Sequence, residues 1–153
     1  MIDKTIGFTL VRNFDATPAE IWQAWTDPAQ ASTWLHPRGF STPRDSVEID
    51  ARVGGRYTYT MVNDASGEEY PVLGVYKEVV ENERLVFTWG NPGEHDDEVP
   101  IITVTIEDLG ELTRMTFDIR GVDGMRGDDF FFDGWESALD SLVGFLGQHQ
   151  VRG

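Results

Sequence analysis

Apolar and polar positions alternate with a period of two through most of this chain, which is the spacing of half-buried β-strands. The first such segment covers residues 5–13, where Ile6, Phe8 and Leu10 alternate with smaller or polar residues. Further strands are predicted over residues 56–62, 69–80, 84–89, 100–107 and 112–120, with a weaker one over residues 46–49. Short polar turns join these segments, so the pattern predicts an antiparallel meander.

Two short helices are predicted directly after the first strand. Thr17 and Glu20 form a capping box, and Pro18 between them suits the first helical position. Asp27 then ends this helix and caps a second one, which stops before the break at residues 36–39. The apolar face of the pair is formed by Ile21, Trp22, Trp25, Ala31, Trp34 and Leu35.

A long helix is predicted over residues 128–150, which would span about 34 Å and could cross a whole sheet. Asp128 or Asp129 suits its start, because a carboxylate there caps the backbone and complements the helix dipole. Three internal glycines are unexpected, since each costs about 1 kcal/mol relative to alanine. Either these glycines permit the close approach of a strand or a ligand to the helix, or the helix frays or ends near Gly144. The apolar stripe consists of Phe131, Trp135, Leu139, Leu142 and Leu146.

These elements leave three apolar surfaces that need cover. The short helices cannot bury their tryptophans alone, the sheet has an apolar face, and the long helix has an apolar stripe. Packing all three together covers each of them. The sequence therefore predicts one α+β domain over residues 1–153, with a curved antiparallel sheet around the long C-terminal helix and a cavity between the two.

Composition excludes several classes of site and partner. There is no cysteine, so disulfides, thiolate metal sites and cysteine nucleophiles are excluded. The formal net charge is −15, which makes nucleic acids and anionic membranes poor partners for this acidic protein. The N-terminus lacks a signal-like apolar segment and no apolar run has membrane-spanning length, so we predict a cytoplasmic protein without membrane insertion.

The density of aromatic residues indicates either a ligand pocket or a filled core, and the sequence leaves both interpretations open. Strand alternation points Tyr57, Tyr59 and Met61 inward, where the two hydroxyl groups could orient a ligand or bond only to protein and water. Apolar pockets with few polar groups are typical of small-molecule sites. The candidate ligand-binding residues are Trp25, Trp34, Tyr57, Tyr59, Met61, Trp89, Met115, Phe117, Phe131, Trp135 and Leu139.

Evidence for catalytic chemistry is weak. No Gly-x-Ser-x-Gly elbow and no phosphate-binding glycine pattern occur. The acidic run at residues 95–98 contains His95, but its spacing matches no metal site and favours a solvated loop. His36 lies beside Trp34 near a predicted cavity mouth and is the histidine to test for acid–base catalysis, although a histidine in a surface turn is the favoured interpretation. No catalytic residue, metal or cofactor is therefore predicted.

Several segments together resemble a known family. The chain is similar to the Hsp90-ATPase-activator-like (AHSA1-type) branch of the START-like, or SRPBCC, superfamily. The resemblance implies a helix-grip fold with one strand, two short helices, six strands and a long helix. The matching segments are residues 18–28, Trp34, residues 53–57, 67–71, 74–76 and 83–89, and Gly134 and Trp135 with Leu139.

The resemblance also implies a function in the cavity, which relatives use for lipids, hormones, polyketides or other apolar molecules. We therefore expect binding of a hydrophobic or amphipathic ligand, entering by loops at residues 39–43, 90–99 or 121–127. One alternative is a cyclase- or hydrolase-type enzyme using the same cavity. Another is an Hsp90-associated protein-binding module, although the extra N-terminal domain of the eukaryotic co-chaperone has no counterpart in these residues. The oligomeric state is expected to be monomer or homodimer.

Overall fold

The computed structural model describes residues 5–94, 98–128 and 131–149. Its order of elements begins with a strand and two helices and ends with a long helix. The helices are α1 (Pro18–Thr26), α2 (Pro28–Trp34) and α3 (Phe131–His149), and η1 (Arg44–Ser46) is a 3₁₀ turn. The strands are β1 (Gly7–Phe14), β2 (Phe40–Ser41), β3 (Glu48–Ile49), β4 (Arg56–Asn63), β5 (Glu69–Val80), β6 (Arg84–Thr88), β7 (Ile101–Asp108) and β8 (Thr113–Arg120).

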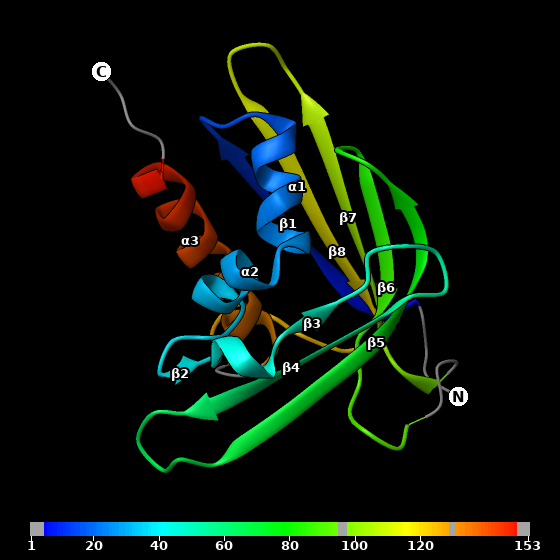
Figure 1. The fold of residues 1–153 in the computed structure, drawn as a ribbon, viewed down its shortest axis with the longest axis vertical. Helices are drawn as coiled ribbons and strands as arrows, with labels where there is room; N and C mark the ends of the chain where they lie inside the picture. Colours follow the sequence, from blue (N-terminus) through cyan, green and yellow to red (C-terminus); the bar gives the residue numbers. More distant parts are fainter. Residues whose placement is uncertain (1–4, 95–97, 129–130, 150–153) are drawn as a thin grey trace.

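The strands form one antiparallel sheet in the order β1-β8-β7-β6-β5-β4-β2, and β3 pairs with β4. The sheet bends strongly, and α1, α2 and α3 gather on its concave side (Figure 1). A bulge between Tyr76 and Glu78 interrupts the pairing of β5 with β6, and bulges of this kind increase strand bending. The predicted fold class is confirmed: a curved antiparallel sheet holds the long C-terminal helix, with two short helices after the first strand.

Local signals place α1 and α2 where the sequence predicts them. The Thr17 side chain accepts a hydrogen bond from the Glu20 backbone N–H at 3.2 Å, and the Glu20 carboxylate accepts one from the Thr17 backbone N–H at 2.9 Å. Asp27 caps α2 by accepting from the Ala29 backbone N–H at 3.0 Å. These contacts satisfy backbone donors that have no partner inside a helix.

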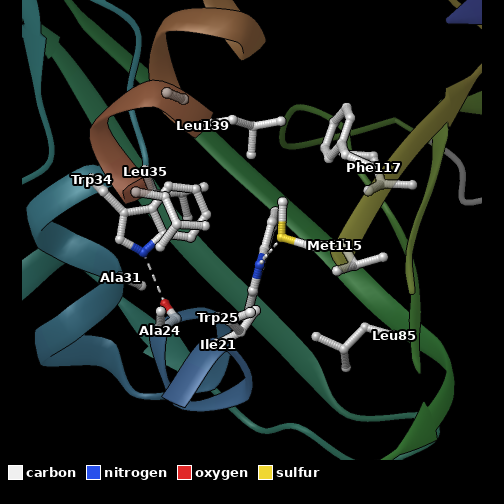
Figure 2. Packing of buried hydrophobic residues seen from close by; sticks show 14 of the residues in the cluster. Ile21, Ala24, Trp25, Ala31, Trp34, Leu35, Leu85, Met115, Phe117 and Leu139 are labelled. Carbon is white, nitrogen blue, oxygen red and sulfur yellow. Dashed lines mark hydrogen bonds between the residues drawn. The ribbon is translucent and has the colours of Figure 1, made fainter. Parts of the chain in front are cut away.

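The helices and the sheet meet in a close-packed core (Figure 2). Trp34 is fully buried, donates its indole N–H to the Ala24 carbonyl at 3.0 Å, and meets Trp25 edge-on with 4.7 Å between ring centroids. The Trp25 indole nitrogen lies 3.3 Å from the Met115 sulfur of β8. Phe117 of the same strand is fully buried, so this part of the interior is solid.

Three details differ from the pattern-based expectations. β2 was not predicted, because two residues of strand carry no periodic signal; Phe40 and Ser41 pair with Asn63 and Val62. The helix α3 continues past Gly144 to His149, so the alternative of an earlier end is wrong. No close approach explains this glycine either, since an added Cβ would meet nothing within 4 Å.

Within the described residues, no helix combines the length and apolar character needed to cross a membrane.

A candidate ligand-binding cleft

An open cleft of about 1120 Å³ lies at one end of the sheet, beside the first half of α3. The loop after α2, strands β4 and β5, and the segments after β6 and β8 complete its walls. Its volume is slightly above the ~300–1,000 Å³ that is typical of small-molecule sites. The main apolar lining residues are Leu35, Phe40, Tyr59, Met61, Val72, Trp89, Val122, Phe131 and Trp135.

Trp89 is central to the aromatic wall of this cleft. Its ring meets Trp135 and Phe131 edge-on, with centroid separations of 5.4 Å and 5.8 Å. Its indole N–H donates to the Tyr59 hydroxyl at 2.9 Å. These contacts join the end of β6 to β4 and to α3, so the wall is held from three elements.

The hydroxyl groups of Tyr57 and Tyr59, the two buried tyrosines predicted to point inward, form different hydrogen bonds. The Tyr57 hydroxyl donates to the Thr88 carbonyl at 2.5 Å, so its proton is already engaged in a hydrogen bond within the protein. The Tyr59 hydroxyl accepts from Trp89, and within the described residues its own proton has no hydrogen-bond acceptor. Burial raises the pKa of Tyr59 above its ordinary value of 10.0, so its phenol stays neutral. Tyr59 therefore keeps a hydrogen-bond donor that a ligand in the cleft could use.

A second, much smaller space lies behind the aromatic wall. It has a volume of about 20 Å³, which is room for a single water molecule. Trp25, Tyr57 and Phe87 are among its lining residues and do not line the cleft. Leu35, Tyr59, Trp89 and Trp135 line both spaces, so these four side chains separate the cleft from the interior.

His36 lies half-buried on the cleft wall, and its hydrogen bonds fix its tautomer. Its Nδ1 atom is 3.0 Å from the Thr42 hydroxyl oxygen, and this hydroxyl donates its only proton to the Leu35 carbonyl at 2.8 Å. Nδ1 must therefore carry a hydrogen and donate to Thr42, which leaves Nε2 as an acceptor in the neutral ring. Desolvation lowers the pKa of His36 below 6.5, against a smaller opposing effect of Asp64, so the neutral ring is favoured.

The cleft carries more negative than positive groups. Arg126 pairs with Glu136 at 2.9 Å, and Arg12, which is not a lining residue, pairs with Asp140 at 3.1 Å. Carboxylates therefore outnumber guanidinium groups along the lining, as they do in the whole sequence. The carboxylates are Glu94, Glu98, Asp133, Glu136 and Asp140, and the guanidinium groups are Arg38 and Arg126.

The structure divides the predicted ligand-binding residues into three groups. Five of them line the cleft: Tyr59, Met61, Trp89, Phe131 and Trp135. Trp25 and Tyr57 line the small internal space. The other four are fully buried and line neither space: Trp34, Met115, Phe117 and Leu139.

All three loops expected at an entrance contribute to the cleft, through Phe40, Asn91 and Val122 among others. Several lining residues lie outside the predicted set, including Leu35, Phe40 and Val122. They come from the end of α2, the two-residue strand β2 and the loop after β8, where alternation along a strand gives no signal. Among the described residues, no group of three or more His, Cys, Asp and Glu side chains could hold a metal ion. The predicted solvated loop with His95 lies outside the described residues, apart from Glu98.

Comparisons with known proteins agree with this architecture. The model of the family described as "Activator of Hsp90 ATPase homolog 1-like protein" (AHSA1) matches residues 15–147. Protein CV1439 from Chromobacterium violaceum is 29% identical with a TM-score of 0.77, covering 90% of this chain and 95% of its own. The AHSA1 protein SPO3351 from Silicibacter pomeroyi is 26% identical with a TM-score of 0.75, covering 94% and 99%.

A more distant structure shares the fold. The protein PFC0360w, an HSP90 activator from Plasmodium falciparum, is 18% identical with a TM-score of 0.68, and the alignment covers 93% of this chain and 96% of that one. No curated protein matches the sequence significantly.

Proposed function

We propose that this protein, which belongs to the AHSA1 family, binds a small hydrophobic or amphipathic molecule in the cleft beside α3. The observation that carries the proposal is the cleft of about 1120 Å³ with an aromatic wall. Tyr59, Trp89 and Trp135 supply apolar surface there, and Tyr59 adds a polar group with an unused donor. A mostly apolar concave site with few polar groups is the usual form of a small-molecule site.

The cleft is large enough for useful affinity. Burying ~250 Å² of ligand apolar surface at ~25 cal/mol/Å² would contribute about 6 kcal/mol before costs. Association and ordering costs reduce this gain, so a dissociation constant in the micromolar range is expected. The aromatic wall is already assembled by the contacts of Trp89, so its ordering adds little to those costs.

The proposal is tested with the neutral fluorescent probe N-phenyl-1-naphthylamine. We expect saturable binding to the wild-type protein, and at least about tenfold weaker binding to Met61→Arg, which places a charge in the apolar wall. Leu109→Arg is the control, because Leu109 is exposed in the turn after β7 and does not line the cleft. Absence of saturable binding, or equal binding by Met61→Arg, would overturn the proposal. If the probe binds as expected, native mass spectrometry of gently purified protein can identify a ligand that is retained from the cell.

A cyclase- or hydrolase-type activity is the second candidate, and one observation favours it. Such an enzyme needs a titratable group at the cleft, and His36 is such a group with an unprotonated Nε2. A general base at this position would be lost in His36→Phe. Turnover of a bound compound by the wild-type protein, abolished by this substitution, would support catalysis, and release of the compound chemically unchanged would count against it.

Association with Hsp90 is the alternative that the family description suggests. It would require an exposed apolar surface of several hundred Å². Among the described residues, the large exposed apolar side chains come from separate elements, such as Val11 on β1, Tyr70 on β5 and Val143 on α3. The cleft therefore favours a small ligand over a protein partner. Stimulation of the ATPase of purified Hsp90 by this protein would reverse that preference.

A further inference from the structure

The polar groups of the cleft select among possible ligands. We propose that the bound molecule has a polar head that donates a hydrogen bond and carries no negative charge, as a hydroxyl or ammonium group does. This inference rests on the proposed ligand binding and names the class of ligand. Two independent observations carry it: the hydrogen-bond acceptor held at His36, and the excess of carboxylates along the lining.

The acceptor follows from the chain of hydrogen bonds behind His36. The Leu35 carbonyl can only accept, so Thr42 must donate to it. Thr42 then has no proton left for His36, and Nδ1 must be the donor in their 3.0 Å contact. Thr42 is 5% exposed, so this arrangement is shielded from competing water. Nε2 has no hydrogen bond to another described residue, and its lone pair suits a donor on the ligand.

A carboxylate head would meet two penalties in this cleft. It has no proton to offer Nε2, so a desolvated acceptor would face another acceptor. It would also approach Glu94 and Glu98 on the segment after β6, while Arg126 is already paired with Glu136 at 2.9 Å. Arg38 is the remaining guanidinium group on the lining, and it is exposed on the loop after α2. Repulsion of this kind is reduced, but not removed, by physiological salt.

A hydroxyl head can form hydrogen bonds of both kinds, as a donor and as an acceptor. It can donate to the Nε2 atom of His36, and it can accept from a donor such as the Tyr59 hydroxyl, whose proton is unused among the described residues. An ammonium head can only donate, but the carboxylates of the lining favour its charge. The two head groups share the donor chemistry, and the experiment separates them.

The test is competition for the cleft by decan-1-ol, decylammonium and decanoate at pH 8, each displacing N-phenyl-1-naphthylamine from the wild-type protein. The three compounds share an apolar chain and differ in the head. We expect the alcohol or the ammonium compound to bind at least about tenfold more tightly than decanoate. If decylammonium has the highest affinity and its advantage over decanoate shrinks with added salt, the carboxylates cause the selection. If decan-1-ol has the advantage over decanoate and salt does not change it, hydrogen bonding causes the selection.

Substitution of His36 tests the acceptor directly. His36→Phe keeps a flat ring but has no acceptor, so the affinity ratio of decan-1-ol to decanoate should fall about three- to tenfold. His36→Gln can present an amide oxygen and should restore part of that ratio. Decanoate binding as tightly as the other two compounds would overturn this inference, and an unchanged ratio in His36→Phe would overturn the acceptor role of His36. Probe binding by the wild-type protein is measured separately, so ligand binding as such would survive either result.

Discussion

At the scale of single residues, two tryptophans with similar burial have different surroundings. Trp34 is enclosed on all sides and donates to the Ala24 carbonyl. Trp135 touches Phe117 at a centroid distance of 4.6 Å, but it also borders the cleft and the small internal space. Removing the Trp34 ring therefore removes close-packed core, whereas removing the Trp135 ring removes part of the cleft wall.

We expect Trp34→Ala to lower the free energy of unfolding by about 3–5 kcal/mol, which is the usual loss for a buried aromatic ring. Trp135→Ala should cost about 1–2 kcal/mol less than that, because one side of its ring already faces space. Urea denaturation measures both values. Probe affinity should fall in Trp135→Ala. Equal stability losses together with unchanged probe binding would show that Trp135 belongs to the packed core alone.

His36 gives a pH dependence with a definite sign. Burial lowers its pKa in the folded protein below 6.5, so folding favours the neutral ring. The stability that this contributes is present above about pH 6.5 and is lost as pH falls through the lowered pKa. The difference in unfolding free energy between the wild-type protein and His36→Gln should therefore shift against the wild type from pH 7 to pH 5. An NMR titration midpoint at or above 6.5 for His36 would contradict this expectation.

At the scale of elements, replacing a glycine by alanine is expected to have opposite effects on stability in β5 and in α3. In β5, a Cβ on Gly74 would lie 2.0 Å from the Thr88 carbonyl oxygen and 2.6 Å from the Tyr57 ring. In α3, a Cβ on Gly144 would meet nothing within 4 Å. The first glycine is required by close approach of β6 and an aromatic ring, and the second only weakens its helix.

Gly74→Ala should lower the free energy of unfolding by about 1–3 kcal/mol or more, because it overpacks the contact between β5 and β6. Gly144→Ala should raise it by about 0.4–1 kcal/mol through helix propensity and a less flexible unfolded chain. Thermal denaturation of the two variants beside the wild-type protein provides the measurement. A loss of stability in Gly144→Ala would contradict the open space found around this position.

The elements also differ in how far the sequence determines them. The capping residues Thr17, Glu20 and Asp27 act on backbone groups a few positions away, so α1 and α2 could be predicted from local sequence. The long strands could be predicted from alternation, which also gave the inward positions of Tyr57 and Tyr59. β2 could not be predicted, because Phe40 and Ser41 become a strand only by pairing with β4.

The candidate site was predictable only in part, for a related reason. Alternation identifies which side chains point inward, and this was enough to place Tyr59 and Met61 on a wall. It does not show where the interior is filled, so Met115 and Phe117 were indistinguishable from lining residues although they lie in solid core. Whether an inward residue faces space depends on the distance between elements far apart in the chain, and no local pattern contains that distance.

At the scale of the whole molecule, charge opposes folding. The 27 acidic residues greatly exceed the 12 basic ones, so compacting the chain brings like charges together. Exposed ion pairs such as Arg52–Asp50 at 2.8 Å oppose this only slightly, since each is worth about 0–1 kcal/mol. Salt weakens both effects, but the repulsion acts among many more groups. Its screening should therefore dominate the response to salt.

Raising ionic strength from 10 to 150 mM shortens the screening length from about 30 Å to about 8 Å. We expect the free energy of unfolding to rise by on the order of 1 kcal/mol over this range, measured by urea denaturation in sodium chloride. A variant with Glu81→Gln, Glu107→Gln and Glu111→Gln is the control, because these exposed carboxylates form none of the described ion pairs. Its response to salt should be smaller, since it has less repulsion to screen. A fall in wild-type stability on adding salt would mean that favourable pairs, such as Arg126 with Glu136, outweigh the net charge.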